Sequence, residues 1–311
     1  GCPVIVKPAS ATPLSAMTIV DSLRQILREA KFSEDWCQLI LCKNTTAEKL
    51  ATDARVSFLS FIGSANVGWD LRSKIAPGCA CALEHGGVAP VIVDASADLD
   101  DAVPRLVKGG YYHAGQVCVS VQRIFVHESL IGAFNTRFAE QVSSLTVGDP
   151  TKESTDVGPL IHPKEVDRVA TWVDEAVAGG AKALCGATQL SETCYQPTVL
   201  LGPDPAAKVS TEEVFGPVTC VYPFGDLNDA IDQANALDVA FQASIFANDH
   251  ARVMAAAERL AGTAVMVNDH TAFRVDWMPF GGYRKSGLGI GGIGHSMRDM
   301  SREKLIVLRT A

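Results

Sequence analysis

The sequence predicts an α/β protein in which a partial, doubly wound parallel sheet is followed by a second α/β domain. Strand-like and helix-like patterns alternate along the first 90 residues, and such alternation is typical of a parallel sheet whose connecting helices cover both faces. The 311 residues are 47% apolar and 20% charged, which is sufficient for two packed domains.

The first strand and helix carry the clearest local signals. Val4–Val6 is strand-like, Thr12 and Pro13 provide a helix N-cap and a first-turn proline, and apolar residues then recur at helical spacing from Leu14 to Leu27. Further strands are expected at 39–41, 56–62, 79–83, 123–126 and Ser301–Arg309, and further helices at 46–53, 67–75, 129–143, 165–178 and 251–260, with another beginning at Asp98.

Three regions are expected along the chain: residues 1–86, residues 87–282 and a C-terminal segment, 283–311. The first boundary is placed near Glu84–Gly87, where the strand at 79–83 ends. The glycine-rich segment Gly287–Gly294 neither follows a predicted strand nor ends in the Lys-Ser/Thr of a phosphate loop. We therefore expect a packed loop there.

Composition excludes several classes of partner. A formal net charge of -8 with 27 Lys and Arg residues argues against nucleic acid. No apolar run approaches the roughly 18 residues that a membrane helix needs, and the N-terminus lacks a signal-peptide pattern. Nine cysteines scattered through apolar segments indicate reduced thiols without disulfides. We expect a cytoplasmic protein that acts on small molecules.

A metal site is not expected. Cys79 and Cys81 lie near His85 and His113 in the sequence, but one residue between two cysteines is too short a spacing for structural zinc. Alternate residues of a strand also place both thiols on one face of the sheet.

Two residues suggest covalent catalysis. Cys118 stands in Gly115-Gln116-Val117-Cys118 and follows Glu84 by 34 residues. A thiolate adds to an aldehyde carbonyl to give a thiohemiacetal, which becomes a thioester after loss of hydride. A carboxylate with a raised pKa can activate the water that hydrolyses a thioester.

Glu212–Pro217 and Pro279–Gly282 complete a set of motifs whose order resembles that of the NAD(P)-dependent aldehyde dehydrogenases. The resemblance implies a Rossmann-like NAD(P)-binding remainder in 1–86 and a catalytic domain in 87–282, with Cys118 as nucleophile and Glu84 as base. It also implies a homodimer or homotetramer in which the expected strand at 301–309 joins a neighbouring subunit's sheet.

The cofactor residues are implied mainly by this resemblance. Gly63-Ser64 lies between a predicted strand and helix, so its amides could face a pyrophosphate, although the G-x-G-x-x-G fingerprint is absent. In the family the residue equivalent to Lys7 binds the adenosine ribose. The equivalent of Glu213 holds the nicotinamide ribose, with that of Phe215 beside it.

Cofactor choice and substrate rest on three further residues. Ser10 stands where NAD-preferring members often have a glutamate that repels a 2'-phosphate, so NADP is tolerated; alternatively Ser10 only faces solvent. Phe280 matches an aromatic residue of the family's aldehyde pocket. Arg274 could hold an anionic or hydroxylated aldehyde, or it could be solvated or paired with Asp276.

The chain also departs from the family. The resemblance covers the C-terminal two thirds and implies that the first third is absent, including an asparagine that donates to the oxyanion. His85, His113 and Ile290-Gly291 replace a commoner leucine, an asparagine and an Arg-Glu pair. Two alternatives stay open: an impaired homologue that binds cofactor or acts structurally, and a dehydrogenase that passes the thioester to coenzyme A.

Overall fold

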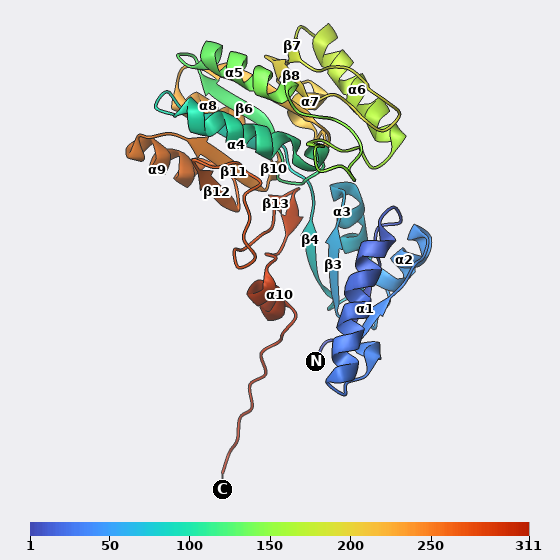
Figure 1. Ribbon diagram of the computed structural model, residues 1–311. Helices are drawn as coiled ribbons and strands as arrows, with labels where there is room; N and C mark the ends of the chain where they lie inside the picture. The colour runs from blue at the N-terminus through green and yellow to red at the C-terminus, as the bar shows by residue number, and fades with distance from the viewer. Residues whose placement is uncertain (311) are drawn as a thin grey trace. The chain divides into compact units, whose positions relative to one another are not determined.

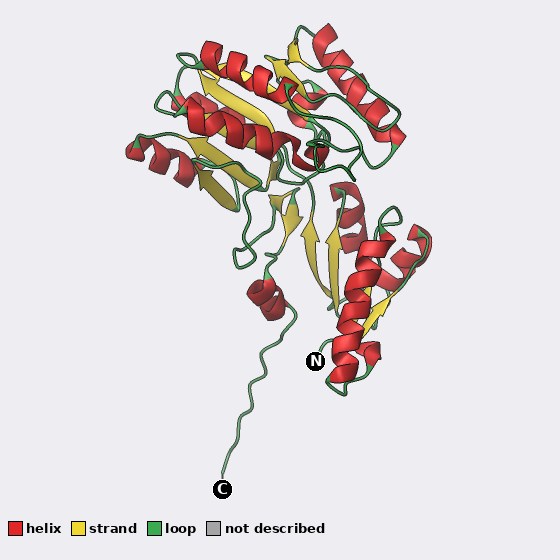
Figure 2. Cartoon of the chain, viewed as in Figure 1, coloured by secondary structure: helices red, strands yellow, loops and turns green. Residues whose placement is uncertain are grey.

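A computed structural model describes residues 1–310, which fall into two compact units (Figures 1 and 2). Unit 1 contains residues 1–60, 69–81 and those from 296 onward, and unit 2 contains 61–68 and 82–295. The division into 1–86, 87–282 and 283–311 stays a prediction, because compactness alone does not show where an independently folding domain begins.

A seven-stranded sheet forms the centre of unit 2, in the order β12-β11-β5-β6-β9-β8-β7. All its neighbouring strands are parallel except the antiparallel pair β7 and β8. The strands are β5 (Ala89–Val93), β6 (Val121–His127), β7 (Lys182–Cys185), β8 (Thr198–Leu201), β9 (Val218–Phe224), β11 (Gln242–Phe246) and β12 (Ala264–Val267). Every residue of β5 is buried, as a central parallel strand requires.

Helices cover both faces of this sheet. The helices α4 and α5 lie on one face, and α8 and α9 lie on the other (Figure 1). The α4 helix begins after Asp98, whose carboxylate accepts the N–H of Asp100 at 2.9 Å, as expected of an N-cap. The helices of this unit are α4 (Leu99–Tyr111), α5 (Ile131–Ser143), α6 (Pro163–Ala178), α7 (Lys208–Thr211), α8 (Leu227–Asn235) and α9 (His250–Arg259). The predicted α/β class with a mainly parallel sheet is confirmed.

A smaller sheet holds the end of the strand that carries Glu84. Its order is β14-β4-β3, with β3 at Phe58–Ile62, β4 at Ala80–Glu84 and β14 at Gly287–Leu288. Gly287 pairs antiparallel with Glu84, so the glycine-rich segment runs beside the predicted base. The remaining elements here are α3 (Ala65–Lys74), the 3-10 helix η2 (Tyr112–Gly115), β10 (Val239–Ala240), β13 (Tyr283–Arg284) and α10 (Ile293–Asp299).

Unit 1 contains a short parallel pair, β1 (Val4–Val6) and β2 (Cys37–Leu39), with α1 (Pro13–Glu29), the 3-10 helix η1 (Glu34–Trp36) and α2 (Asn44–Ala51). The strand expected at 39–41 thus begins two residues earlier. Proline occupies the first turn of α1 as predicted, but the Thr12 side chain makes no capping hydrogen bond.

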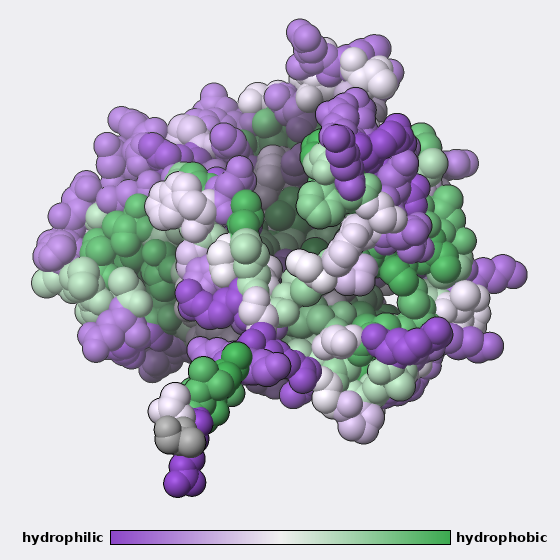
Figure 3. All heavy atoms as spheres, turned by 90° about the horizontal axis from the view of Figure 1, so that it is seen from below, coloured by the Kyte–Doolittle hydropathy of each residue, from purple (hydrophilic) through white to green (hydrophobic). Residues whose placement is uncertain are grey.

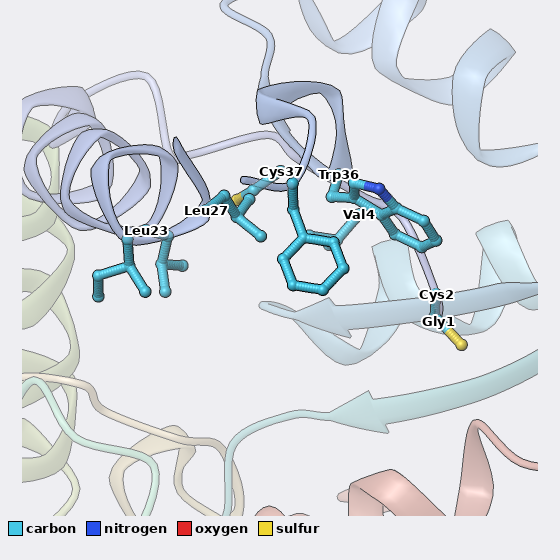
Figure 4. A pocket seen from close by; sticks show the side chains of 9 residues that line it. Gly1, Cys2, Val4, Leu23, Leu27, Trp36 and Cys37 are labelled. Atoms are coloured by element: carbon cyan, nitrogen blue, oxygen red, sulfur yellow. The ribbon is translucent and has the colours of Figure 1, made fainter. Parts of the chain in front are cut away.

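Apolar side chains remain exposed in unit 1. Leu14 on α1 is 72% exposed and Phe32 is 62% exposed. A hollow of about 390 Å³ opens between α1 and the segments around β1 and β2, with Leu23, Leu27 and Trp36 among its walls (Figure 4). Figure 3 likewise shows hydrophobic residues interspersed among hydrophilic ones on one face of the molecule.

The strand expected at Ser301–Arg309 is not formed. This segment has no regular secondary structure, and Leu305 and Leu308 are 87% and 86% exposed. An extended segment becomes a strand only by backbone pairing, and no strand of residues 1–310 pairs with it. The prediction was wrong for the isolated chain, while addition to a neighbouring subunit's sheet stays a prediction.

Within residues 1–310 no helix has the length and apolar character needed to cross a bilayer. The nine cysteines are free thiols. No group of three or more His, Cys, Asp or Glu residues suited to a metal ion occurs in that same range.

Candidate active site

A strained turn precedes Cys118, which lies just before the central strand β6 of the large sheet. His113, Ala114 and Gly115 have φ angles of 50°, 56° and 69°, all in the left-handed region. A β-carbon at Gly115 would lie 2.1 Å from the carbonyl oxygen of Gly216. Only glycine therefore fits where the Gly115–Cys118 motif meets the Glu212–Pro217 motif.

Gln116 fastens the loop that precedes Cys118. Its Nε2 donates to the Pro159 carbonyl at 3.2 Å, and its Oε1 accepts the N–H of Ile161 at 2.9 Å. The sequence showed this glutamine only as part of a motif. Gln116 thus joins the loop that precedes the half-buried Cys118 to the segment 159–161.

The environment of Cys118 favours the neutral thiol. Burial raises the pKa of the thiol from 9.0 to about 12, and the negative charges of Glu213 and then Glu84 reinforce the rise. The positive charge of Arg274 acts in the opposite direction. Attack on a carbonyl consequently requires a group that removes the thiol proton.

Glu84 lies at the end of β4 and is partly buried. Burial raises the pKa of its carboxyl, although the charge of Arg274 lowers it. A β-carbon at Gly291 would lie only 2.6 Å from Glu84 Oε1. The backbone at Gly291 is held there by Phe280, whose N–H donates to the Gly291 carbonyl at 3.1 Å. Sequence reasoning noted Gly291 only as a departure from the family.

Glu213 places a second carboxyl group beside Cys118. Burial raises its pKa from 4.5 to about 7, while the N–H of Gly87 and the charge of Arg168 lower it. Its Oε1 is buried and has no hydrogen-bond partner among the described residues. A carboxyl in this setting can take up or release a proton near neutral pH.

The substrate side combines aromatic and cationic groups. The ring of Phe280 packs 4.8 Å from that of Phe241, and the Arg274 guanidinium lies 4.1 Å over the Phe280 ring. Arg274 is exposed, and no ion pair joins it to Asp276 within residues 1–310. Sequence reasoning missed Tyr112, where burial, and then the charge of Cys118, raise the pKa of the hydroxyl to about 12.

The Gly63-Ser64 turn opens helix α3. The Gly63 N–H donates to the Glu84 carbonyl at 3.1 Å. The first-turn N–H groups of Ala65, Asn66 and Val67 have no acceptor within the helix, so they form a suitable cradle for a phosphate.

Lys7 and Ser10 lie in unit 1. Lys7 Nζ is 3.5 Å from Asn44 Oδ1. Ser10 is exposed and helps to line a hollow of about 170 Å³ together with Pro8, Pro13, Leu41 and Cys42. Phe215, in unit 2, has a φ of 45° and is 40% exposed, so its ring is available for contact.

The aldehyde dehydrogenase family profile matches residues 1–306. The chain belongs to this family. It is 37% identical over 309 residues to 3-sulfolactaldehyde dehydrogenase of Priestia megaterium, which covers 99% of the chain and 64% of that relative.

Two solved structures of the family are similar throughout. Aldehyde dehydrogenase 21 of Physcomitrella patens, in complex with the reaction product succinate, is 36% identical with a TM-score of 0.93, over 99% of this chain and 63% of that one. Glyceraldehyde-3-phosphate dehydrogenase GapN of Methanocaldococcus jannaschii, complexed with NADP, is 34% identical with a TM-score of 0.92, over 96% and 65%.

The chain thus spans 64% of the length of the curated relative. Within unit 2, the charges of Glu213, Glu84 and Arg274 act on the pKa of the Cys118 thiol, and that of Arg274 also acts on Glu84. Lys7 and Ser10 belong to unit 1. Membership of the aldehyde dehydrogenase family and the local geometry together define a candidate site around Cys118.

Proposed function

We propose that the protein oxidises a small anionic aldehyde to a carboxylic acid with NAD(P). The observation that carries this proposal is the convergence on Cys118 of two carboxyl groups with raised pKa, Glu84 and Glu213, and of the Arg274 cation. Membership of the aldehyde dehydrogenase family gives the reaction class.

Cys118 is the nucleophile in this proposal. Its thiol proton passes to a neighbouring carboxylate as Sγ adds to the aldehyde carbon, and its backbone N–H is a donor for the developing oxyanion. NAD(P), when bound, would supply the acceptor for the hydride that leaves the carbon attached to Sγ. Glu84 then takes a proton from the water that attacks the resulting thioester, and the acid leaves as the thiol re-forms.

The residues that would hold the cofactor fit its chemistry. In unit 2, the first turn of α3 after Gly63-Ser64 offers N–H groups to the pyrophosphate, and Glu213 offers a carboxyl group to the nicotinamide ribose. The family resemblance alone implies Lys7 as the partner of the adenosine ribose. Phe215 lies two residues after Glu213 in the sequence. Ser10 carries no charge to repel a 2'-phosphate, so NADP as well as NAD is expected to bind.

Arg274 is proposed to bind the anionic end of the aldehyde. Its side chain is exposed, lies over the Phe280 ring and forms no ion pair with Asp276. The relatives named above act on 3-sulfolactaldehyde and glyceraldehyde-3-phosphate or carry succinate as product, all of them anionic compounds. A guanidinium forms charge-assisted bonds with carboxylate, sulfonate or phosphate groups.

The test uses the 311-residue chain, NADP or NAD, and two four-carbon aldehydes, anionic succinic semialdehyde and neutral butanal. We expect NAD(P)H formation that is faster with the anionic aldehyde and absent in Cys118→Ala. In Glu84→Gln, the Cys118 peptide should gain the mass of the aldehyde less two hydrogens, as expected of a thioester that is not hydrolysed. Cys194→Ser, a loop thiol, serves as the control.

The same assay separates the two alternatives. Cofactor binding without NAD(P)H formation would favour an impaired homologue. Product formation that requires coenzyme A and yields an acyl-coenzyme A would favour the acylating enzyme. Free acid without coenzyme A supports the proposed hydrolysis.

We also propose that the apolar segment Leu305–Leu308 pairs with a second copy of the chain. Four consecutive side chains that are at least 70% exposed are unfavourable in water. Light scattering should give a dimer or tetramer, and Ile306→Lys with Leu308→Lys should give a monomer. A monomeric unmodified chain would contradict the pairing.

A further inference from the structure

His85 follows Glu84 directly and is almost fully buried, at 2% exposure. Its Nδ1 lies 2.9 Å from the carbonyl oxygen of Gly63. Because a carbonyl oxygen can only accept a hydrogen bond, Nδ1 carries the proton and donates it. The side chain next to the proposed base therefore bonds to the turn that opens α3.

Gly63 is held on both sides by this pair of residues. Its N–H donates to the Glu84 carbonyl at 3.1 Å, and its own carbonyl accepts from His85. The backbone N–H of His85 in turn donates to the Ser286 carbonyl at 2.9 Å. Movement of the turn must therefore also displace the peptide that joins Glu84 to His85.

The imidazole has little freedom to move. A β-carbon at Gly68 would lie 2.0 Å from its Cε1, so the ring occupies the space that any side chain at position 68 would need. On another side the Phe61 ring lies 6.0 Å away between centroids, tilted by 57°. The histidine at position 85 thus fits only because position 68 is a glycine.

We propose that His85 is a positioning residue that couples the Gly63-Ser64 turn to Glu84. This inference rests on the proposed function, in which the turn binds the cofactor pyrophosphate and Glu84 is the base. The hydrogen bond fixes the Gly63 peptide, so that the first-turn N–H groups of α3 face the phosphate before the cofactor arrives. Leucine, the commoner residue in the family, has no donor for this bond.

Three variants of the full chain test the coupling. His85→Asn can keep a donor near the position of Nδ1, whereas His85→Leu keeps apolar bulk and removes the donor. Gly68→Ala displaces the ring without changing position 85. His127→Asn, which alters a histidine bonded to Ser129, is the control.

The first readout is amide hydrogen exchange of residues 61–68 without cofactor. We expect exchange about tenfold faster in His85→Leu and Gly68→Ala, and within about threefold of the unmodified protein in His85→Asn and His127→Asn. Unchanged exchange in both His85→Leu and Gly68→Ala would overturn the inference, whatever the protein catalyses.

The second readout is the Kd for NADP and for NAD by calorimetry, with KM and kcat measured in parallel. We expect Kd and cofactor KM to rise about tenfold in His85→Leu, with a smaller change in kcat, and to recover in His85→Asn. Equal Kd values in the unmodified protein and His85→Leu would refute the proposed coupling but leave the proposed function standing. Failure of the unmodified protein to bind either cofactor would refute the proposed function, and this inference with it.

Discussion

Gly86 and Glu213 fit together so closely that a β-carbon at position 86 would lie 1.9 Å from Glu213 Oε2. The two residues are 127 positions apart, yet the missing side chain of one makes room for the carboxyl group of the other. The Gly87 N–H also bonds to this carboxyl. The Gly86-Gly87 pair thereby sets the distance of a negative charge from Cys118.

Gly86→Ala should displace the Glu213 carboxyl and lower the pKa of the Cys118 thiol, because the charge of Glu213 contributes more to the raised pKa than that of Glu84. At pH 9 we expect alkylation of Cys118 by iodoacetamide to be severalfold faster, measured by mass spectrometry of its peptide. Gly132→Ala is the matched control, since a β-carbon there would lie within 4 Å of no atom outside its chain neighbours and its own helix backbone. An unchanged rate would show that the carboxyl does not move.

Glu213→Gln should also accelerate alkylation of Cys118, since it removes a charge that raises the pKa of the thiol. The effect at pH 9 should reach about tenfold. It should vanish below about pH 6, where Glu213, with a pKa of about 7, is already protonated. Glu84→Gln should have the smaller effect, because Glu84 contributes less to the rise. The same acceleration at every pH would contradict this assignment.

The stability of the protein should depend on pH through Glu213. Its folded pKa of about 7 exceeds the ordinary value of 4.5, so the unfolded state binds fewer protons between these values and stability falls as pH rises through that window. The ionised group costs up to about 3 kcal/mol at pH 8. In urea unfolding, Glu213→Gln should raise the free energy of unfolding by most of this amount at pH 8 and by little at pH 4.5. The control Glu153→Gln, at an exposed site, should leave the free energy of unfolding unchanged at both pH values.

Arg274→Ala should reduce kcat/KM for succinic semialdehyde by about 10- to 100-fold, because a charge-assisted hydrogen bond is lost. With butanal the change should stay within about threefold. Arg274→Lys should recover part of the loss, since lysine keeps the charge but not the planar fork. Arg55→Ala, which removes an exposed partner of Asp53, is the control. Equal losses with both aldehydes would exclude a recognition role.

Ser10→Glu should shift cofactor preference towards NAD. A carboxylate beside the adenosine ribose would repel a 2'-phosphate, so KM for NADP should rise about tenfold or more while KM for NAD changes little. Steady-state kinetics with both cofactors gives the ratio. Ser15→Glu, in the first turn of α1, controls for charge alone. No change in the ratio would indicate that Ser10 only faces solvent.

Local patterns in the sequence were sufficient for several elements of the fold, although they did not single out strands such as β5 and β9. Asp98 marks the start of α4, Pro13 lies in the first turn of α1, and the apolar residues from Leu14 to Leu27 that recur at helical spacing lie within α1. These features depend on capping, a fixed φ angle and side-chain period, all of which act within a few residues. Ser301–Arg309 failed as a strand because pairing is not a local property.

For the site, the sequence by itself singled out Cys118 and Glu84, because each stands in a short motif with a chemical purpose. Only the tertiary structure showed that the Glu213 carboxyl occupies the space left by the missing side chain of Gly86, and that Glu84 lies against Gly291. These contacts join residues more than 100 positions apart, and no periodicity of a strand or helix extends so far. The sequence was thus enough to identify the reactive groups of the candidate site. Their protonation and the shape of the site depend on the tertiary structure, because backbone segments distant in sequence approach these groups so closely that only glycine fits.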